Sequence, residues 1–182
     1  MPHSATAILT IGHSTRPLDE FIGLLKHFQV TLLVDVRTMP RSRKNPQFNR
    51  ESLPQALEEE GIRYAHIPGL GGLRRSILKE SPNTGWRTSG FRSYADYMAT
   101  EEFEDNLERL IELARDAQVA IVCAEALPWR CHRSLISDAL TVRGVEVSHI
   151  MSQTSCLLHT LTAWARVEGT RLTYPVPQPE GE

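Results

Sequence analysis

The sequence predicts an α/β fold: one domain on a largely parallel sheet of five strands, or slightly more, with helices on both faces in a Rossmann-like three-layer sandwich. Two observations predict it. Short apolar runs alternate with segments whose apolar residues recur at helical spacing, which is the pattern of βαβ units. A chain of 182 residues with a hydrophobic fraction of 41% and a net charge of −2 is long enough for one sizeable core.

Five apolar runs are predicted to be strands, and the helical patterns lie around them. The strands cover residues 7–11, 31–36, 62–67, 119–122 and 145–150. The helices cover residues 18–28, 52–60, 103–114 and 134–143, and Gly61 and Gly144 stand where helix-ending glycines are expected. The predicted domain spans residues 1–175, and a proline-rich, flexible tail is predicted over residues 176–182.

Composition favours a cytoplasmic protein without a membrane partner. The three cysteines include no close pair, which is typical of a reducing compartment rather than of a disulfide framework. The N-terminal residues lack the basic and apolar regions of a signal peptide. No apolar run approaches the roughly 20 residues of a membrane span.

The densest group of reactive side chains follows the predicted strand 119–122. Cys123, Glu125, Cys131, His132 and Arg133 lie on the turn from that strand into the next helix. Backbone N–H groups and the helix dipole attract anions at such a turn, and the same field lowers the pKa of the Cys131 thiol. Arg133 can add a bidentate contact to a phosphate or carboxylate. The alternative is that Cys131 is a small buried apolar residue and that Arg133 forms a structural pair with Glu125.

Polar residues also follow two other predicted strands. His13 and Ser14 come after the first strand, and Asp35 and Arg37 end the second. The carboxyl ends of parallel strands meet at one edge of the sheet, where open α/β sheets bind ligands. The sequence therefore predicts a crevice site there, although His13 could instead cap a turn and Asp35 could simply pair with Arg37.

No cofactor or metal site is strongly indicated. Cys123 and Cys131 have seven residues between them, which is wider than the usual spacing of structural zinc ligands. A zinc deaminase would need a second thiol pair that the chain lacks. A phosphatase-like loop after Cys123 would hold a glutamate inside its anion cradle. The metal candidates that remain are Cys123, Cys131 and His132, together with a distant His13 or His149.

Two predicted connections, 37–50 and 74–92, are rich in basic residues. Together they hold 10 of the 20 lysines and arginines, and they carry Phe48, Trp86 and Phe91, which could stack on bases. Tyr94 and Tyr97 are three residues apart, so one helical turn would point both at the same pocket. A basic face of this kind suits a small phosphorylated ligand or nucleic acid; the alternative is an ordinary solvated surface.

Several short motifs together resemble those of the family of domain of unknown function 488. In chain order they are Thr10-Ile11-Gly12-His13-Ser14, Asp35-Val36-Arg37 with Pro40 and Ser42, Gly61-Ile62-Arg63-Tyr64, Leu70-Gly71-Gly72, Tyr94 with Tyr97 and Met98, Cys123-Ala124-Glu125 with Cys131-His132-Arg133, and His149-Ile150. The resemblance covers roughly residues 8–175 and implies a small α/β domain of bacterial or archaeal type and of unestablished activity. The reaction must therefore be argued from the site.

The function expected is that of an enzyme acting on a nucleotide, nucleic acid or other phosphate-bearing ligand in the crevice. Glu125 or Asp35 would serve as general acid or base, assisted by His13 or His132. Cys131 is the further catalytic candidate. The residues expected to bind the ligand are Ser14, Arg37, Arg41, Tyr94, Tyr97 and Arg133.

Two alternatives stay open. The first is a non-catalytic nucleotide- or nucleic-acid-binding module that uses the basic loops 37–50 and 74–92. The second is thiol- or metal-dependent activity at Cys123 and Cys131. Redox chemistry ranks last because no second cysteine stands close to Cys131 in the sequence. The oligomeric state is not indicated.

Overall fold

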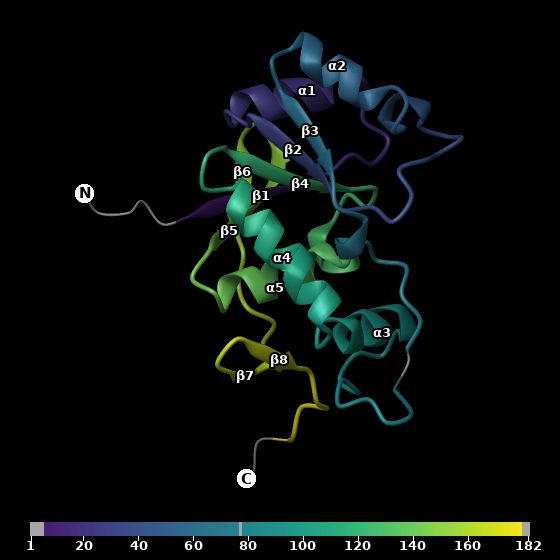
Figure 1. The fold of residues 1–182 in the computed structure, drawn as a ribbon, viewed down its shortest axis with the longest axis vertical. Helices are drawn as coiled ribbons and strands as arrows, with labels where there is room; N and C mark the ends of the chain where they lie inside the picture. The colour runs from purple at the N-terminus through teal and green to yellow at the C-terminus, as the bar shows by residue number, and fades with distance from the viewer. Residues whose placement is uncertain (1–5, 77, 180–182) are drawn as a thin grey trace, which may run out of the picture.

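A six-stranded sheet forms the centre of the structure, a computed structural model that describes residues 6–76 and 78–179 (Figure 1). Its strands are β1 (Ala7–Gly12), β2 (Leu32–Asp35), β3 (Arg63–His66), β4 (Val119–Cys123), β5 (Glu146–Ser152) and β6 (Ser155–Leu158). They lie in the order β3-β2-β4-β1-β5-β6. The first five run parallel, and β6 pairs antiparallel with β5. The predicted α/β fold with a largely parallel sheet is therefore confirmed, and β6 adds an edge strand.

Helices cover both faces of the sheet. They are α1 (Leu18–His27), α2 (Leu53–Glu59), α3 (Ser89–Tyr97), α4 (Glu101–Leu113) and α5 (Arg133–Thr141). Apolar side chains of α1 and α2 form one core cluster with the sheet, and those of α3, α4 and α5 form the other. Successive strand residues point to opposite faces, so Leu33 belongs to the first cluster and Val34 to the second.

The central strands β2 and β4 are buried along their whole length. A strand covered by helices on both faces has no solvent-facing side, which is why these two appear in the sequence as continuous apolar runs rather than as alternating patterns. The helices have their own local signals. In α4, the Thr100 side chain caps the N-terminus by accepting a hydrogen bond from the Phe103 N–H, and Glu101 and Glu102 lie in the first turn.

The connections after β1 and β4 leave the sheet in opposite directions. These two strands are neighbours, but the chain after β1 continues into α1 on one face and the chain after β4 continues into α5 on the other. A reversal of this kind opens a crevice at the carboxyl ends of the two strands. The polar residues after β1 and β4 therefore lie at the point where an open α/β sheet is best shaped to hold a ligand.

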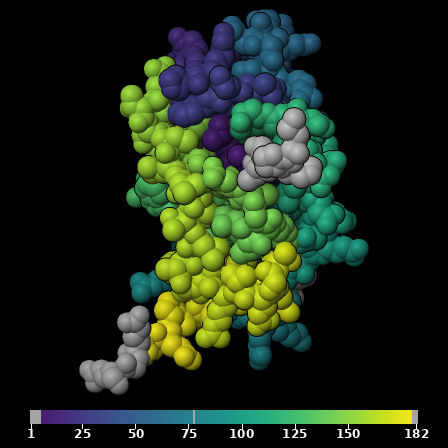
Figure 2. All heavy atoms as spheres, turned by 90° about the vertical axis from the view of Figure 1, so that its left-hand side faces the viewer, coloured from purple at the N-terminus to yellow at the C-terminus, as the bar shows by residue number. Residues whose placement is uncertain are grey.

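The segment after β5 differs most from the sequence-based expectation. It contains β6 and a small antiparallel pair, β7 (Arg166–Glu168) and β8 (Arg171–Thr173). In Figure 2 this segment, yellow-green to yellow, covers much of one face, from beside α1 to the opposite end of the molecule. Residues 1–5 of the predicted domain, residue 77, and residues 180–182 of the predicted tail lie outside the described residues. None of the described helices is long and apolar enough to cross a membrane.

Candidate functional site

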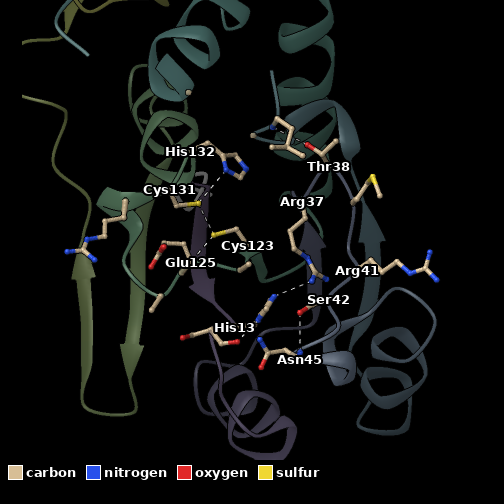
Figure 3. Close-up of a pocket in the computed structure, with 18 of the residues that line it drawn as sticks. His13, Arg37, Thr38, Arg41, Ser42, Asn45, Cys123, Glu125, Cys131 and His132 are labelled. Carbon is tan, nitrogen blue, oxygen red and sulfur yellow. Dashed lines mark hydrogen bonds between the residues drawn. The ribbon is translucent and has the colours of Figure 1, made fainter. Parts of the chain in front are cut away.

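A cavity of about 660 Å³ lies at the carboxyl ends of β1, β2 and β4 (Figure 3). Its volume is in the range of small-molecule sites. Four connections line it, contributing His13, Ser14 and Thr15 after β1; Arg37, Thr38, Met39, Arg41, Ser42 and Asn45 after β2; Gly72, Leu73, Gly90, Phe91 and Tyr94 before and within α3; and Cys123, Ala124, Glu125, Ala126, Arg130, Cys131 and His132 after β4. We call this cavity the crevice. It brings together segments that the sequence predicted to converge.

The chain ends of β1 and β4 stay in close contact beyond the strands. The N–H groups of His13 and Ser14 donate to the carbonyl oxygens of Cys123 and Ala124, at 2.9 and 3.0 Å. A side chain at Gly12 would place its Cβ only 2.0 Å from the Glu125 carbonyl oxygen. Glycine is therefore required where the two turns meet, and its small size holds the reactive residues of both turns against one another.

Two thiols meet at the floor of the crevice. The Sγ atoms of Cys123 and Cys131 are 2.8 Å apart, and both residues are buried and free of disulfide bonds. The Cys131 Sγ also lies 3.4 Å from His132 Nδ1 and accepts a hydrogen bond from the Arg133 N–H at 3.5 Å. Burial by itself raises the pKa of Cys131, but the hydrogen bonds that its sulfur makes with Cys123 and His132, together with the charges of His132 and Arg133, outweigh it and hold this pKa well below the usual range. Burial and the neighbouring Cys131 raise the pKa of Cys123.

The imidazole of His132 is held in one orientation. Its Nε2 lies 3.0 Å from the Val36 carbonyl oxygen, which can only accept, so Nε2 carries a proton and Nδ1 faces the Cys131 thiol. Gly72 packs against the ring, where an added Cβ would lie 2.6 Å from Nδ1. A thiol, a base and a carbonyl that orients the base are the parts of an activated cysteine nucleophile.

Arg133 is buried beneath the crevice and 1% exposed. Its guanidinium donates to the Thr10 hydroxyl at 3.0 Å and to the backbone carbonyls of Glu125 and Ala126 at 2.8 and 3.3 Å. Its Nε is buried without a hydrogen-bond partner among residues 6–76 and 78–179. The predicted pair with Glu125 thus forms through the backbone of Glu125. Arg133 acts on the thiols through its charge, and its burial leaves little of it for direct contact with a ligand.

A chain of buried hydrogen bonds runs from Arg133 to Asp138. Asp138 accepts from His159 Nε2 at 2.8 Å, so His159 Nδ1 accepts from His149 Nε2 at 2.9 Å. His149 Nδ1 then accepts from the Thr10 hydroxyl at 2.7 Å, and Thr10 accepts from Arg133. Arg133 only donates and Asp138 only accepts, while Thr10, His149 and His159 each donate once and accept once along the chain, which determines the tautomer of both histidines. Burial, with smaller contributions from His159 and Arg133, lowers the pKa of His149 to about 4, in agreement with its neutral, accepting role.

His13, Asp35 and Arg37 form a second hydrogen-bonded group. The Arg37 guanidinium pairs with the fully buried Asp35 carboxylate at 2.6 Å and also donates to the Phe48 carbonyl oxygen. Because His13 Nδ1 donates to the Ser14 carbonyl, its Nε2 accepts from Arg37 at 3.2 Å. Burial is the main reason that the pKa of His13 is lowered. The alternative in which Asp35 pairs with Arg37 is the arrangement that the structure shows.

The remaining predicted residues separate into those at the crevice and those away from it. Glu125 and Arg41 are exposed and line the crevice. Tyr94 also lines it, but its hydroxyl donates to the Leu70 carbonyl, and burial raises its pKa well above the usual value. Tyr97 lies under the Arg74 guanidinium and lines a different cavity. The two tyrosines therefore do not face the same pocket, contrary to the expectation from their spacing.

The predicted stacking aromatics also separate. Phe48 is fully buried and stacks on the His13 ring, so it is not open to a base. Trp86 packs against Phe91, Trp164 and Tyr174, and Phe91 is the member of the predicted set that lines the crevice. In the part of the chain that the structure describes, no three His, Cys, Asp or Glu side chains are grouped so that they could hold a metal ion.

Sequence reasoning missed two features of the site. One is the contact between Cys123 and Cys131, which depends on a short 3-10 turn over Pro128–Arg130 that folds the chain back; the proline at the start of that turn is the signal that could have indicated it. The other is the chain from Thr10 through His149 and His159 to Asp138. Its members come from four separated segments, and no spacing rule connects them.

The comparisons with known proteins place the chain in a family. The family described as Domain of unknown function DUF488 matches residues 17–140. The match covers more than half of the chain, and the protein belongs to this family. No curated protein and no solved structure matches the chain. The family carries no established reaction in its description, so the activity has to be argued from the crevice.

Proposed function

We propose that the protein is an enzyme in which Cys131 is the nucleophile and His132 its proton acceptor, acting on a small phosphate-bearing substrate in the crevice. The observation that carries the proposal is the Cys131–His132 pair: a thiol 3.4 Å from an imidazole nitrogen whose other nitrogen donates to the Val36 carbonyl. The pair lies at the floor of a cavity large enough for a nucleotide-sized ligand.

The position of the pair adds to the argument. Cys131 lies two residues before the first residue of α5, and the N–H of that residue, Arg133, donates to its sulfur. A thiolate is stabilised there by the helix dipole and by the buried Arg133 guanidinium. We take the sheet as Rossmann-like because the connections after the neighbouring strands β1 and β4 leave to opposite faces. In such sheets ligands bind at the point where the connections diverge.

The proposed reaction transfers a group through a covalent intermediate. The Cys131 thiol passes its proton to His132 Nδ1, and the sulfur forms a bond to the electrophilic atom of the substrate. The bond from that atom to the leaving group breaks, and the leaving group takes the electron pair and the proton from His132. Water or a hydroxyl group of a second substrate then attacks, gives its proton to His132, and releases the Cys131 thiolate.

The lining of the crevice supports a phosphate-bearing substrate. Arg41 and Arg130 are exposed and line it, and the hydroxyl-bearing residues Ser14, Thr15 and Ser42 line it as well. The two arginines can hold the phosphate, whereas Arg37 is committed to Asp35. Glu125, exposed on the same side as Cys131, would accept a hydrogen bond from the attacking hydroxyl and orient it (Figure 3).

The thiolate can be measured without knowing the substrate. We expect the ultraviolet absorbance of the reduced protein to show a thiolate step below the usual cysteine range as pH is raised. Cys131→Ser should abolish the step, and His132→Gln should move it to higher pH because the sulfur loses a hydrogen-bond partner. Cys156→Ser, which removes the exposed cysteine on β6, is the matched control and should keep the step. A protein with no step below the usual range would overturn the proposal.

The substrate class is tested by thermal unfolding with nucleotides, sugar phosphates and short oligonucleotides. A ligand at 100 times its dissociation constant stabilises the folded state by about 2.7 kcal/mol, which is visible as a shift of the melting temperature. Arg41→Ala and Arg130→Ala should reduce the shift, whereas Arg109→Ala on the exposed side of α4 should not. A shift only with oligonucleotides, lost at high salt, would instead support the nucleic-acid-binding alternative.

A further inference from the structure

In the reaction proposed above, the contact between the two buried thiols helps to stabilise the Cys131 thiolate, but Cys123 itself forms and breaks no bond. Cys123 ends β4, Cys131 precedes α5, and both sulfurs open onto the same crevice. Cys123 is 2% exposed and Cys131 is 7% exposed, so each depends on the crevice for access to solvent. The third cysteine, Cys156, is exposed on the edge strand β6.

We propose that Cys123 and Cys131 form a reversible oxidation site for small hydroperoxides, in which Cys131 reacts first and Cys123 closes a disulfide with it. Two geometric observations point to this assignment. The sulfurs are already 2.8 Å apart, and a disulfide of about 2.05 Å requires them to approach by less than about 1 Å. Cys131 alone contacts His132 and the Arg133 N–H, so the two thiols are unequal, as an attacking and a resolving cysteine must be.

The first step oxidises Cys131. Its thiolate sulfur attacks one oxygen of the hydroperoxide, and the O–O bond breaks. Cys131 becomes a sulfenic acid, and the departing alkoxide, or hydroxide when the oxidant is hydrogen peroxide, takes the proton held on His132. The oxidant is reduced to an alcohol or to water, and the two electrons come from the sulfur.

The second step joins the two cysteines. The Cys123 sulfur attacks the Cys131 sulfur, the S–O bond breaks, and hydroxide leaves as water with the proton from Cys123. In total two thiols and one hydroperoxide give one disulfide, one alcohol or water, and one further water. An external dithiol returns the pair to the reduced state by thiol–disulfide exchange.

The oxidised pair would block the proposed reaction. A disulfide removes the thiolate that faces His132, so oxidation would switch the nucleophile off without unfolding the protein. The inference rests on the proposed function only through the reactive Cys131 thiolate, and it requires no turnover of the unidentified substrate.

The test follows each cysteine of the full-length protein separately. Reduced protein is treated with hydrogen peroxide, alkylated after denaturation, and mapped by peptide mass spectrometry. We expect loss of two of the three thiols, a Cys123–Cys131 disulfide within one chain, slower oxidation of Cys156, and full recovery with dithiothreitol. In Cys123→Ser the oxidation should stop at the sulfenic acid, and dimedone should label Cys131. Cys156→Ser should behave as the wild type.

Three results would overturn the inference: oxidation of Cys156 at the same rate as Cys131, a disulfide between chains only, or retention of free Cys123 and Cys131. The wild-type protein suffices for each of these, so an unstable variant does not weaken the test.

Thiolate absorbance separates the two proposals. A low-pH thiolate step without a disulfide rejects the oxidation site alone, whereas the absence of the step rejects the proposed nucleophile.

Discussion

Lowering the pH should destabilise the protein through His149. In the folded state His149 Nδ1 accepts from Thr10, and protonation would place two donors face to face. Burial, with smaller contributions from His159 and Arg133, lowers its pKa from 6.5 to about 4. The unfolded chain takes up this proton at the ordinary histidine pKa, so the unfolded state binds more protons between these two pH values. Stability is therefore fully present above about pH 6.5 and falls as pH drops toward 4.

The magnitude follows from the shift. At about 1.36 kcal/mol per pKa unit, the complete loss below pH 4 is about 3.4 kcal/mol, and the loss at pH 5 is about 2 kcal/mol. His149 is 6% exposed, so solvent screening removes little of this value. It is an upper limit, because local opening around β5 would let the histidine become protonated at lower cost.

Urea unfolding at about pH 7.5 and about pH 5 measures the loss. We expect the wild type to lose about 2 kcal/mol more than His149→Gln between the two pH values, since the variant has no histidine to protonate at this position. His27→Gln, which removes an exposed histidine at the end of α1, is the control and should follow the wild type. Equal losses in the wild type and His149→Gln would refute the reasoning.

Two glycine substitutions test the packing of the site. Gly72→Ala should displace the His132 ring, because its Cβ would lie 2.6 Å from the Nδ1 atom that contacts Cys131, and should move the thiolate absorbance step to higher pH. Gly90→Ala, also on the crevice but with open space around its Cβ, should leave the step in place, and equal effects would contradict the proposed contact. Gly12→Ala forces a methyl group against the Glu125 carbonyl and should cost about 3 kcal/mol or more in urea unfolding. Gly23→Ala in α1 has open space and should be neutral or slightly stabilising; a similar cost in both would contradict the close approach.

The sheet could be predicted because its inner strands are covered on both faces. Continuous burial leaves a direct pattern in the sequence, as in β2 and β4. The strands that were missed are short and mostly exposed: β6, β7 and β8 carry few buried residues and so lack any apolar period. The N-terminal part of α3 lies in the predicted basic connection 74–92, and it begins with Ser89 and Gly90, which are weak helix formers.

The site could be predicted in its location but less well in its contacts. Topology alone brings the residues after β1, β2 and β4 to one edge, and that expectation depends only on the strands being parallel. Which side chains touch depends on turns and on packing. Sequence distance suggested that Cys131 had no partner, whereas the Pro128–Arg130 turn brings Cys123 against it. Arg37 and Arg133 looked like free cations, but each is held by partners already within the fold.

The buried chain of hydrogen bonds from Arg133 to Asp138 also determines which fragment of the protein keeps its fold. The family match covers residues 17–140, yet Thr10 lies before that range and His149 and His159 lie after it. Tyr174 closes the far end, where its hydroxyl donates to Asp138. A fragment limited to the matched residues would also lack β1, the strand between β4 and β5. The shortest fragment that contains the whole sheet and every member of this hydrogen-bonded chain therefore runs from β1 to Tyr174.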